Sequence, residues 1–211
     1  MASPDVITAV DARIVLHNWH IPDQDLPRTA IRPYPSAYVK QWIARNGLSM
    51  TIRPIRPEDE PKMVHFHESL SDRSVYLRYF HPMVLSARVT HERLSRICFV
   101  DYDRALVLVA ESPDGDIVAV ARLMRLPPSP EAEFAVLVSD AWQGRGLGTE
   151  LLSSLLAVAR KEDIHRVFGQ ILGENRAMQQ VCRRLGFKTE YSIEEGAVEA
   201  SIVLAADSAR D

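Results

Sequence analysis

The clearest pattern of apolar and polar positions lies between residues 133 and 159. Apolar side chains at Phe134, Val136 and Val138 predict a strand, and the turn-forming pair Ser139 and Asp140 marks its end. A loop with three glycines follows. A helix is predicted after this loop, because apolar residues then recur at helical spacing without an internal glycine or proline: Leu147, Leu151, Leu152, Leu155, Leu156 and Ala159.

The glycine loop has the features of an anion site. Where such a loop opens a helix, backbone N–H groups lack partners, the helix dipole favours negative charge, and glycine allows a phosphate to approach closely. Two common phosphate loops do not fit. The P-loop needs a lysine after its last glycine, and the dinucleotide motif needs unequal spacing, whereas Gly144, Gly146 and Gly148 are evenly spaced.

The rest of the pattern predicts an α/β chain with a mixed sheet. Turn signals, capping residues and apolar periodicity divide residues 50–204 into short elements. Strands are expected at 50–55, 105–111, 117–125, 166–172, 187–191 and 197–204, and helices start near 56 and 71 and span 90–100 and 175–185.

Residues 1–49 differ from the remainder. They are rich in proline and aromatic residues, with a strand expected at 12–16 and a short helix at 36–45. Such a segment cannot bury a core alone. We therefore expect an N-terminal extension at 1–49, one domain at 50–205 and a tail at 206–211.

Composition narrows the class of protein. The 211 residues are 46% hydrophobic and 25% charged, as is typical of a soluble globular protein, and the net charge of -3 gives no reason to expect nucleic acid. The two cysteines cannot make a disulfide framework, no metal-binding spacing is present, and no segment is long enough to span a membrane. A cytoplasmic enzyme is expected.

Three motifs together resemble the GNAT superfamily of N-acetyltransferases. These are Gln143-x-x-Gly146-x-Gly148, the segment from Asn175 to Met178, and the segment from Arg184 to Phe187. The resemblance implies a mostly antiparallel mixed sheet, splayed at its central strands, with helices on both faces. It also implies acetyl-CoA as co-substrate and no metal.

The resemblance also assigns the co-substrate contacts. Backbone groups of the glycine loop would bind the pyrophosphate, and Arg145 could add a charged contact. A backbone N–H of the central strand, freed by a bulge, would stabilise the oxyanion. The residues expected to contact acetyl-CoA are Val136, Leu137, Val138, Gln143, Gly144, Arg145, Gly146, Leu147, Gly148, Thr149 and Asn175. Asn175 is equally suited to cap a helix.

Acetyl transfer to a lysine needs a base, because a lysine amine of pKa about 10.4 is mostly protonated at neutral pH. In the family that this chain resembles, an acid on the central strand has this role, which indicates Glu133; Glu131, on the same strand face, is the competitor. Cys182 stands where many members carry a tyrosine that protonates the leaving thiolate. An acyl-enzyme on this thiol is conceivable, but buried packing is the favoured interpretation.

Two further resemblances bear on the acceptor. Residues 71–80 resemble the corresponding segment of protein-lysine acetyltransferases that modify acyl-CoA synthetases, and residues 11–16 and 31–35 resemble the tail of an ADP-forming acyl-CoA synthetase. The expected function is acetyl transfer to a protein lysine by direct, base-assisted attack on the thioester, with an acyl-CoA synthetase as one expected partner. A small-amine or amino-acid acetyltransferase, or a non-catalytic acyl-CoA sensor, are the alternatives.

Overall fold

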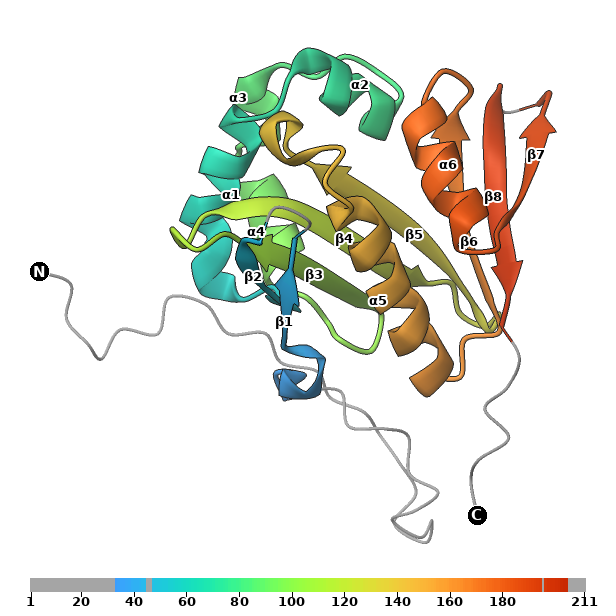
Figure 1. Cartoon of the computed structure of the whole chain (residues 1–211), viewed down its shortest axis with the longest axis horizontal. Coiled ribbons are helices and arrows are strands. Elements are labelled where there is room, and N and C mark those ends of the chain that lie inside the picture. Colours follow the sequence, from blue (N-terminus) through green and yellow to red (C-terminus); the bar gives the residue numbers. More distant parts are fainter. Residues whose placement is uncertain (1–32, 45–46, 195, 205–211) are drawn as a thin grey trace, which may run out of the picture.

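The computed structural model describes residues 33–44, 47–194 and 196–204, which form an eight-stranded sheet with helices on both faces (Figure 1). The strand order is β1-β2-β3-β4-β5-β6-β8-β7, and every neighbouring pair is antiparallel except β5 and β6. The strands are β1 (Lys40–Ile43), β2 (Ser49–Pro54), β3 (Ala105–Glu111), β4 (Ile117–Arg125), β5 (Glu131–Val138), β6 (Arg166–Leu172), β7 (Lys188–Ser192) and β8 (Ala197–Val203).

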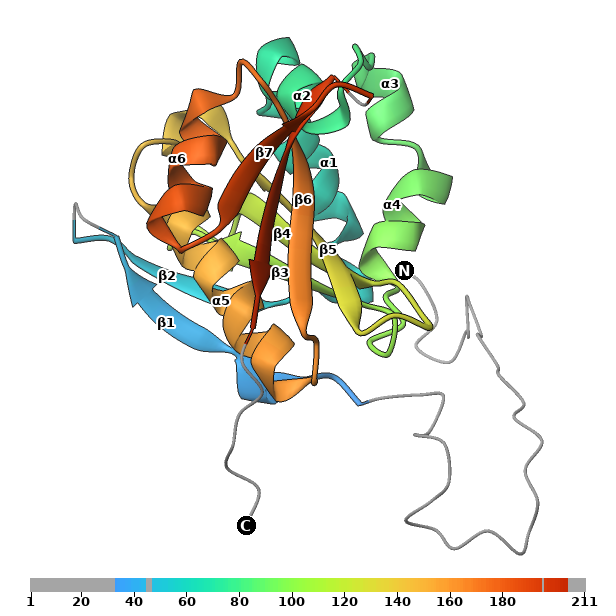
Figure 2. The same ribbon diagram turned by 90° about the vertical axis from the view of Figure 1, so that its right-hand side faces the viewer.

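The helices lie in two groups, one on each face of the sheet (Figure 2). They are α1 (Glu60–Glu68), α2 (Asp72–Tyr79), α3 (Leu85–Arg88) and α4 (His91–Cys98) on one side, and α5 (Leu147–Lys161) and α6 (Arg176–Arg184) on the other. Short 3₁₀ helices precede β1, α1 and α5. Within the described ranges, no helix is long and apolar enough to cross a bilayer.

Strand β3 explains why its sequence is an unbroken apolar run. Successive side chains of a strand point to opposite faces. Leu106 and Leu108 join the core under α5, while Val107 and Val109 join a second core under α1 and α4. Both faces are buried, so a polar residue at any of these four positions would lose its hydration.

The architecture expected from the sequence is confirmed, including the bounds of the strands at 105–111, 117–125 and 166–172. The helix expected at 36–45 is wrong. Ser36–Tyr38 forms a single 3₁₀ turn, and Lys40–Ile43 pairs with β2 at the edge of the sheet. Trp42 packs against the core while Ile43 stays exposed, so strand pairing outweighs local preference here.

The expected division of the chain stays a prediction. The strand proposed at 12–16 and the tail at 206–211 lie outside the described residues. Strand β1 lies before the boundary drawn at residue 50 and is paired to β2 as part of the common sheet.

The two central strands separate after a short paired segment. Strands β5 and β6 pair over three residue pairs, of which the last joins Glu133 and Phe168. Next along the chains, Phe134 lies against Gly169, where an added Cβ would come within 2.8 Å of the phenyl ring and 2.9 Å of the Phe134 carbonyl oxygen. Phe187 supports the ring edge-on, with 5.2 Å between centroids. Beyond this contact the strands diverge (Figure 1).

We expect Gly169→Ala to lower the free energy of unfolding by about 1–3 kcal/mol, the usual cost of overpacking a core, because its methyl group would meet backbone as well as ring atoms. Thermal unfolding would measure it. Gly173→Ala is the matched control, since its Cβ meets no described atom within 4 Å, and should change stability by less than about 0.5 kcal/mol. Equal losses in both variants would contradict the packing assigned to Gly169.

Candidate functional site

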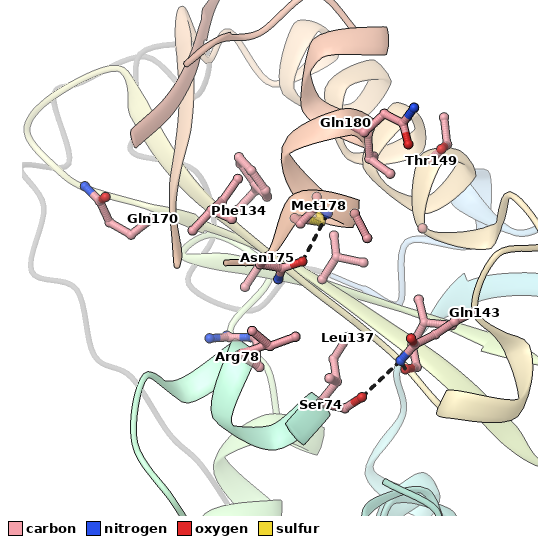
Figure 3. Close-up of a pocket in the computed structure, with 18 of the residues that line it drawn as sticks. Ser74, Arg78, Phe134, Leu137, Gln143, Thr149, Gln170, Asn175, Met178 and Gln180 are labelled. Atoms are coloured by element: carbon pink, nitrogen blue, oxygen red, sulfur yellow. Dashed lines mark hydrogen bonds between the residues drawn. The ribbon is translucent and has the colours of Figure 1, made fainter. Parts of the chain in front are cut away.

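A cavity of about 810 Å³ lies where β5 and β6 diverge. Its walls come from α2 on one side and α6 on the other, with the edge of β5 between them and the glycine loop at one end. Figure 3 shows Ser74 and Arg78 of α2 facing this space from one side and Asn175, Met178 and Gln180 from the other. The cavity therefore collects elements far apart in the sequence.

The edge of β5 presents free backbone groups to the cavity. The Ser139 N–H donates to the Val118 carbonyl on β4 at 2.9 Å, and backbone groups alternate sides along a strand. The N–H groups of Val136 and Val138 are therefore directed toward the gap left by β6, whereas those of Leu137 face β4. The Val138 carbonyl accepts a hydrogen bond from Gln143 Nε2 at 3.0 Å.

The bulge expected in this strand is absent. The register between β4 and β5 runs without a shift from Ala119–Val138 to Arg125–Ala132. The backbone groups are free instead because β6 diverges from β5 after Glu133. This divergence depends on how two strands pack, so the sequence of β5 alone does not predict it.

The glycine loop has the conformation of an anion-binding helix start. Gly144 and Gly146 have φ of 71° and 92°, in the left-handed region that favours glycine, and Gly146 caps α5. The Glu150 N–H is the first that bonds back along the helix, to the Gly146 carbonyl at 3.0 Å. The N–H groups of Leu147, Gly148 and Thr149 precede it and have no intrahelical acceptor.

A hydrogen-bond network fixes this loop to the start of α2. Asp140 accepts bonds from the Ser71 backbone (2.9 Å), the Ser71 hydroxyl (2.7 Å) and the Ser74 hydroxyl (2.9 Å). Gln143 Nε2 also donates to Ser74 Oγ at 3.0 Å (Figure 3). Partial burial alone would raise the pKa of Asp140, but these hydrogen bonds lower it below its usual value, so the carboxylate stays ionised.

The side chains of three residues expected to contact a ligand make contacts within the protein instead of, or in addition to, facing the cavity. The Arg145 guanidinium stacks on Trp142, 4.9 Å from its ring, and is outside the cavity lining. Leu147 is buried in the core, which leaves its backbone N–H as its contribution. The Asn175 side chain lines the cavity, and its Oδ1 caps α6 by accepting from the Met178 N–H at 3.1 Å.

Cys182 is fully buried and lies outside the cavity lining. Burial raises the pKa of its thiol to about 12, with a small opposing effect from the charge of Arg183. A thiol that stays protonated and enclosed cannot serve as a nucleophile at neutral pH. Packing, the favoured interpretation from the sequence, is therefore its role.

The two acidic candidates have different environments. Glu133 lines the cavity at the last paired position before β5 and β6 separate. Glu131 is outside the cavity lining and forms an ion pair with Arg166 at 3.4 Å. Arg166 also binds Glu199 at 2.5 Å. Of the two acids, Glu133 is therefore the one that a molecule bound in the cavity could contact.

Sequence reasoning missed the side chains that α2 contributes beside Glu133. Arg78 and Tyr79 line the cavity, and burial lowers the pKa of Arg78 while the charges of Tyr79 and Glu133 oppose this shift. Residues 71–80 were singled out by their resemblance to protein-lysine acetyltransferases, but no spacing rule indicated that an arginine would face inward. No group of three or more metal-ligating side chains occurs in the described parts of the chain.

Comparison with known proteins gives one consistent family. The domain family described as acetyltransferase (GNAT) domain matches residues 49–188. The GNAT domain of PAT from S. lividans superposes with a TM-score of 0.76 and 32% identity, covering 82% of this chain and 100% of that one.

Two curated relatives match over 145 residues, which are 67% of this chain. The acetyltransferase PA5475 of Pseudomonas aeruginosa is 28% identical over 76% of its length. The acetyltransferase Pat of Mycolicibacterium smegmatis is 30% identical, and the match covers 42% of its length. The chain therefore corresponds to less than half of Pat.

We expect Gly146→Ala to raise the dissociation constant of acetyl-CoA about tenfold or more. Alanine in the left-handed region costs about 1–2 kcal/mol, so the loop would shift and its N–H groups would turn away from the phosphates. Calorimetric titration would measure the affinity. Gly148→Ala is the matched control for folding, since its Cβ would make an ordinary 3.8 Å contact with Val138, and it should unfold at the wild-type temperature. Unchanged affinity in Gly146→Ala would refute the loop's assignment.

Proposed function

This chain belongs to the GNAT family of acetyltransferases, and from that premise we propose that it transfers the acetyl group of acetyl-CoA to the side-chain amine of a lysine in a protein. One observation carries the mechanism. Glu133 lines the cavity at the position where β5 loses its partner strand, next to the backbone N–H groups that this loss sets free.

The glycine loop and the gap suit the two ends of acetyl-CoA. The N–H groups from Gly144 to Thr149 and the dipole of α5 would hold the pyrophosphate. The gap between β5 and β6 is lined by apolar as well as polar groups and leads from the loop toward Glu133. The thioester would thus lie along the edge of β5, with its carbonyl oxygen within reach of the N–H groups of Val136 and Val138.

Each chemical requirement then has a candidate group. Glu133 accepts the proton that the lysine amine loses, directly or through a water, as the nitrogen attacks the thioester carbon. A backbone N–H directed into the gap donates to the oxygen that becomes negative. The carbon–sulfur bond then breaks, and a thiolate of pKa about 8.5 leaves without needing a positioned acid. Direct transfer fits the inert environment of Cys182.

The protein acceptor is supported by similarity to Pat and to the PAT domain. The α2 segment, which carried this expectation from the sequence, forms a wall of the cavity. An acyl-CoA synthetase remains our proposed partner. A non-catalytic acyl-CoA sensor has no need of a carboxylate at position 133, which is the feature that argues for an enzyme.

We expect Glu133→Gln to lower kcat about 10²–10⁴-fold at neutral pH, the usual contribution of a positioned base, and to leave the acetyl-CoA affinity near wild type. The amide keeps the size of the side chain but cannot accept the proton. Because more of the amine arrives deprotonated as the pH rises toward about 10.4, the loss should shrink at high pH. A thiol-release assay with a lysine peptide across pH would measure this.

Glu131→Gln is the matched control on the same strand. Its carboxylate is held by Arg166 outside the cavity, so kcat should fall by no more than a few-fold. If the two variants exchanged behaviour, Glu131 would be the base. If Glu133→Gln turned over at nearly the wild-type rate at neutral pH, proton removal would belong to solvent.

A further inference from the structure

A second cavity, of about 480 Å³, adjoins the first on the face of the sheet covered by α1 and α4. The two cavities share Arg78, Tyr79, Ala135 and Leu137 as lining residues. Side chains two apart on a strand lie on the same face. Glu133 therefore lies on the same face of β5 as Ala135 and Leu137, although it lines the first cavity alone.

The second cavity is strongly electropositive. The described residues that line it include four arginines, Arg78, Arg93, Arg96 and Arg122, and one carboxylate, Glu92. That carboxylate lies at the rim, with an exposed side chain, and is already paired with Arg96 at 2.6 Å. The inner arginines thus have no carboxylate partner among the described residues of this lining, and the nearby charge of Glu133 acts on Arg78 from the first cavity.

Several buried donors in this cavity lack an acceptor. His67 is 1% exposed, and neither of its ring nitrogens has a hydrogen-bond partner among the described residues. The Nε–H groups of Arg93 and Arg122 are also buried and have no hydrogen-bond acceptor among the described residues. Burial, with the charges of Arg93 and Arg88, lowers the pKa of His67 to about 4, so the ring is neutral at pH 7 and still offers one N–H.

Three of these arginines, Arg78, Arg93 and Arg122, contact neighbouring side chains. The Tyr79 ring has the Arg78 guanidinium at 5.0 Å and the Arg93 guanidinium at 4.8 Å. Arg122 lies on β4 directly opposite Ala135, and its Nη2 rests on the Met124 sulfur at 3.1 Å. Met124 in turn lies opposite Glu133, so Arg122 is on the strand next to the proposed base, two residues from its cross-strand partner.

We propose that this cavity binds a carboxylate of the acceptor, so that the acetylated amine is one that has an acidic group close by. Buried Nε–H groups without an acceptor are costly, as at Arg93 and Arg122, and a carboxylate supplies two acceptor oxygens that match the guanidinium fork. On the proposed function, from which this inference follows, the carboxylate is an aspartate or glutamate beside the target lysine. The α-carboxylate of a free amino acid is the other source with the same chemistry.

The test compares matched lysine peptides with the intact chain and saturating acetyl-CoA. Each peptide has one glutamate near the lysine, and its partner has glutamine at the same place. We expect kcat/KM to be about 10- to 100-fold higher for the best glutamate peptide than for its partner, the range for a hydrogen bond to a charged group. The difference should appear in KM for the peptide and leave KM for acetyl-CoA unchanged.

Arg122→Gln and Arg93→Gln should each reduce the preference for glutamate toward unity, with thermal unfolding recorded for both variants. Arg160→Gln is the matched control, because Arg160 is exposed in the last turn of α5, outside both cavity linings, and the variant should keep the wild-type preference. The comparison in the wild-type protein needs no variant, so an unfolded mutant would not remove the test.

The possible failures are distinct. Equal rates for glutamate and glutamine peptides would overturn the carboxylate site and leave lysine acetylation standing. If no lysine peptide reacted but free glutamate were acetylated with a dependence on Arg122, the site would stand and the protein acceptor would be wrong. A glutamate preference that survived in both arginine variants would also overturn the assignment of this cavity.

Discussion

The close approach of Phe134 to Gly169 is the contact on which the site depends. Because the ring takes the space that a side chain at Gly169 would need, β5 and β6 meet tightly at that level. Beyond it the strands diverge, and the edge of β5 loses its hydrogen-bonding partner. An unpaired edge inside a protein is normally a liability. Here the gap becomes a cavity in which those backbone groups can meet a ligand.

The glycine loop and helix α2, which forms one wall of the cavity, are joined by hydrogen bonds. Asp140 joins the end of β5 to Ser71 and Ser74 at the start of α2, and Gln143 adds a bond from the loop. A shift of α2 would therefore strain or break the hydrogen bonds that hold the loop. This coupling gives the glutamine of the motif a structural reason, since its amide bridges Ser74 and the Val138 carbonyl.

Strands, helix starts and the glycine loop could be predicted because they depend on local sequence patterns. Features that depend on contacts between distant segments could not. Alternation and glycine placement predicted β5, the loop and the start of α5, whereas the choice of Glu133 as the base came from the resemblance to the acetyltransferase family. The edge strand at Lys40–Ile43 could not be predicted, because its conformation comes from pairing with β2. The arginine cluster could not be predicted from the sequence either, because Arg78, Arg93 and Arg122 come from three elements that only the fold brings together.

The arginines of the second cavity bear on how readily an acceptor amine loses its proton. A lysine ammonium is repelled by nearby guanidinium groups, and neighbouring positive charge lowers an amine's pKa by favouring its neutral form. In the proposed mechanism, Arg78 and Arg122 would therefore favour the deprotonated amine that attacks the thioester, while Glu133 would accept the proton. A bound carboxylate would moderate this effect by screening the arginines once the acceptor is in place. An acceptor lacking that carboxylate would meet the unscreened cluster, so on this proposal the charges that assist proton loss would also select against amines without an acidic neighbour.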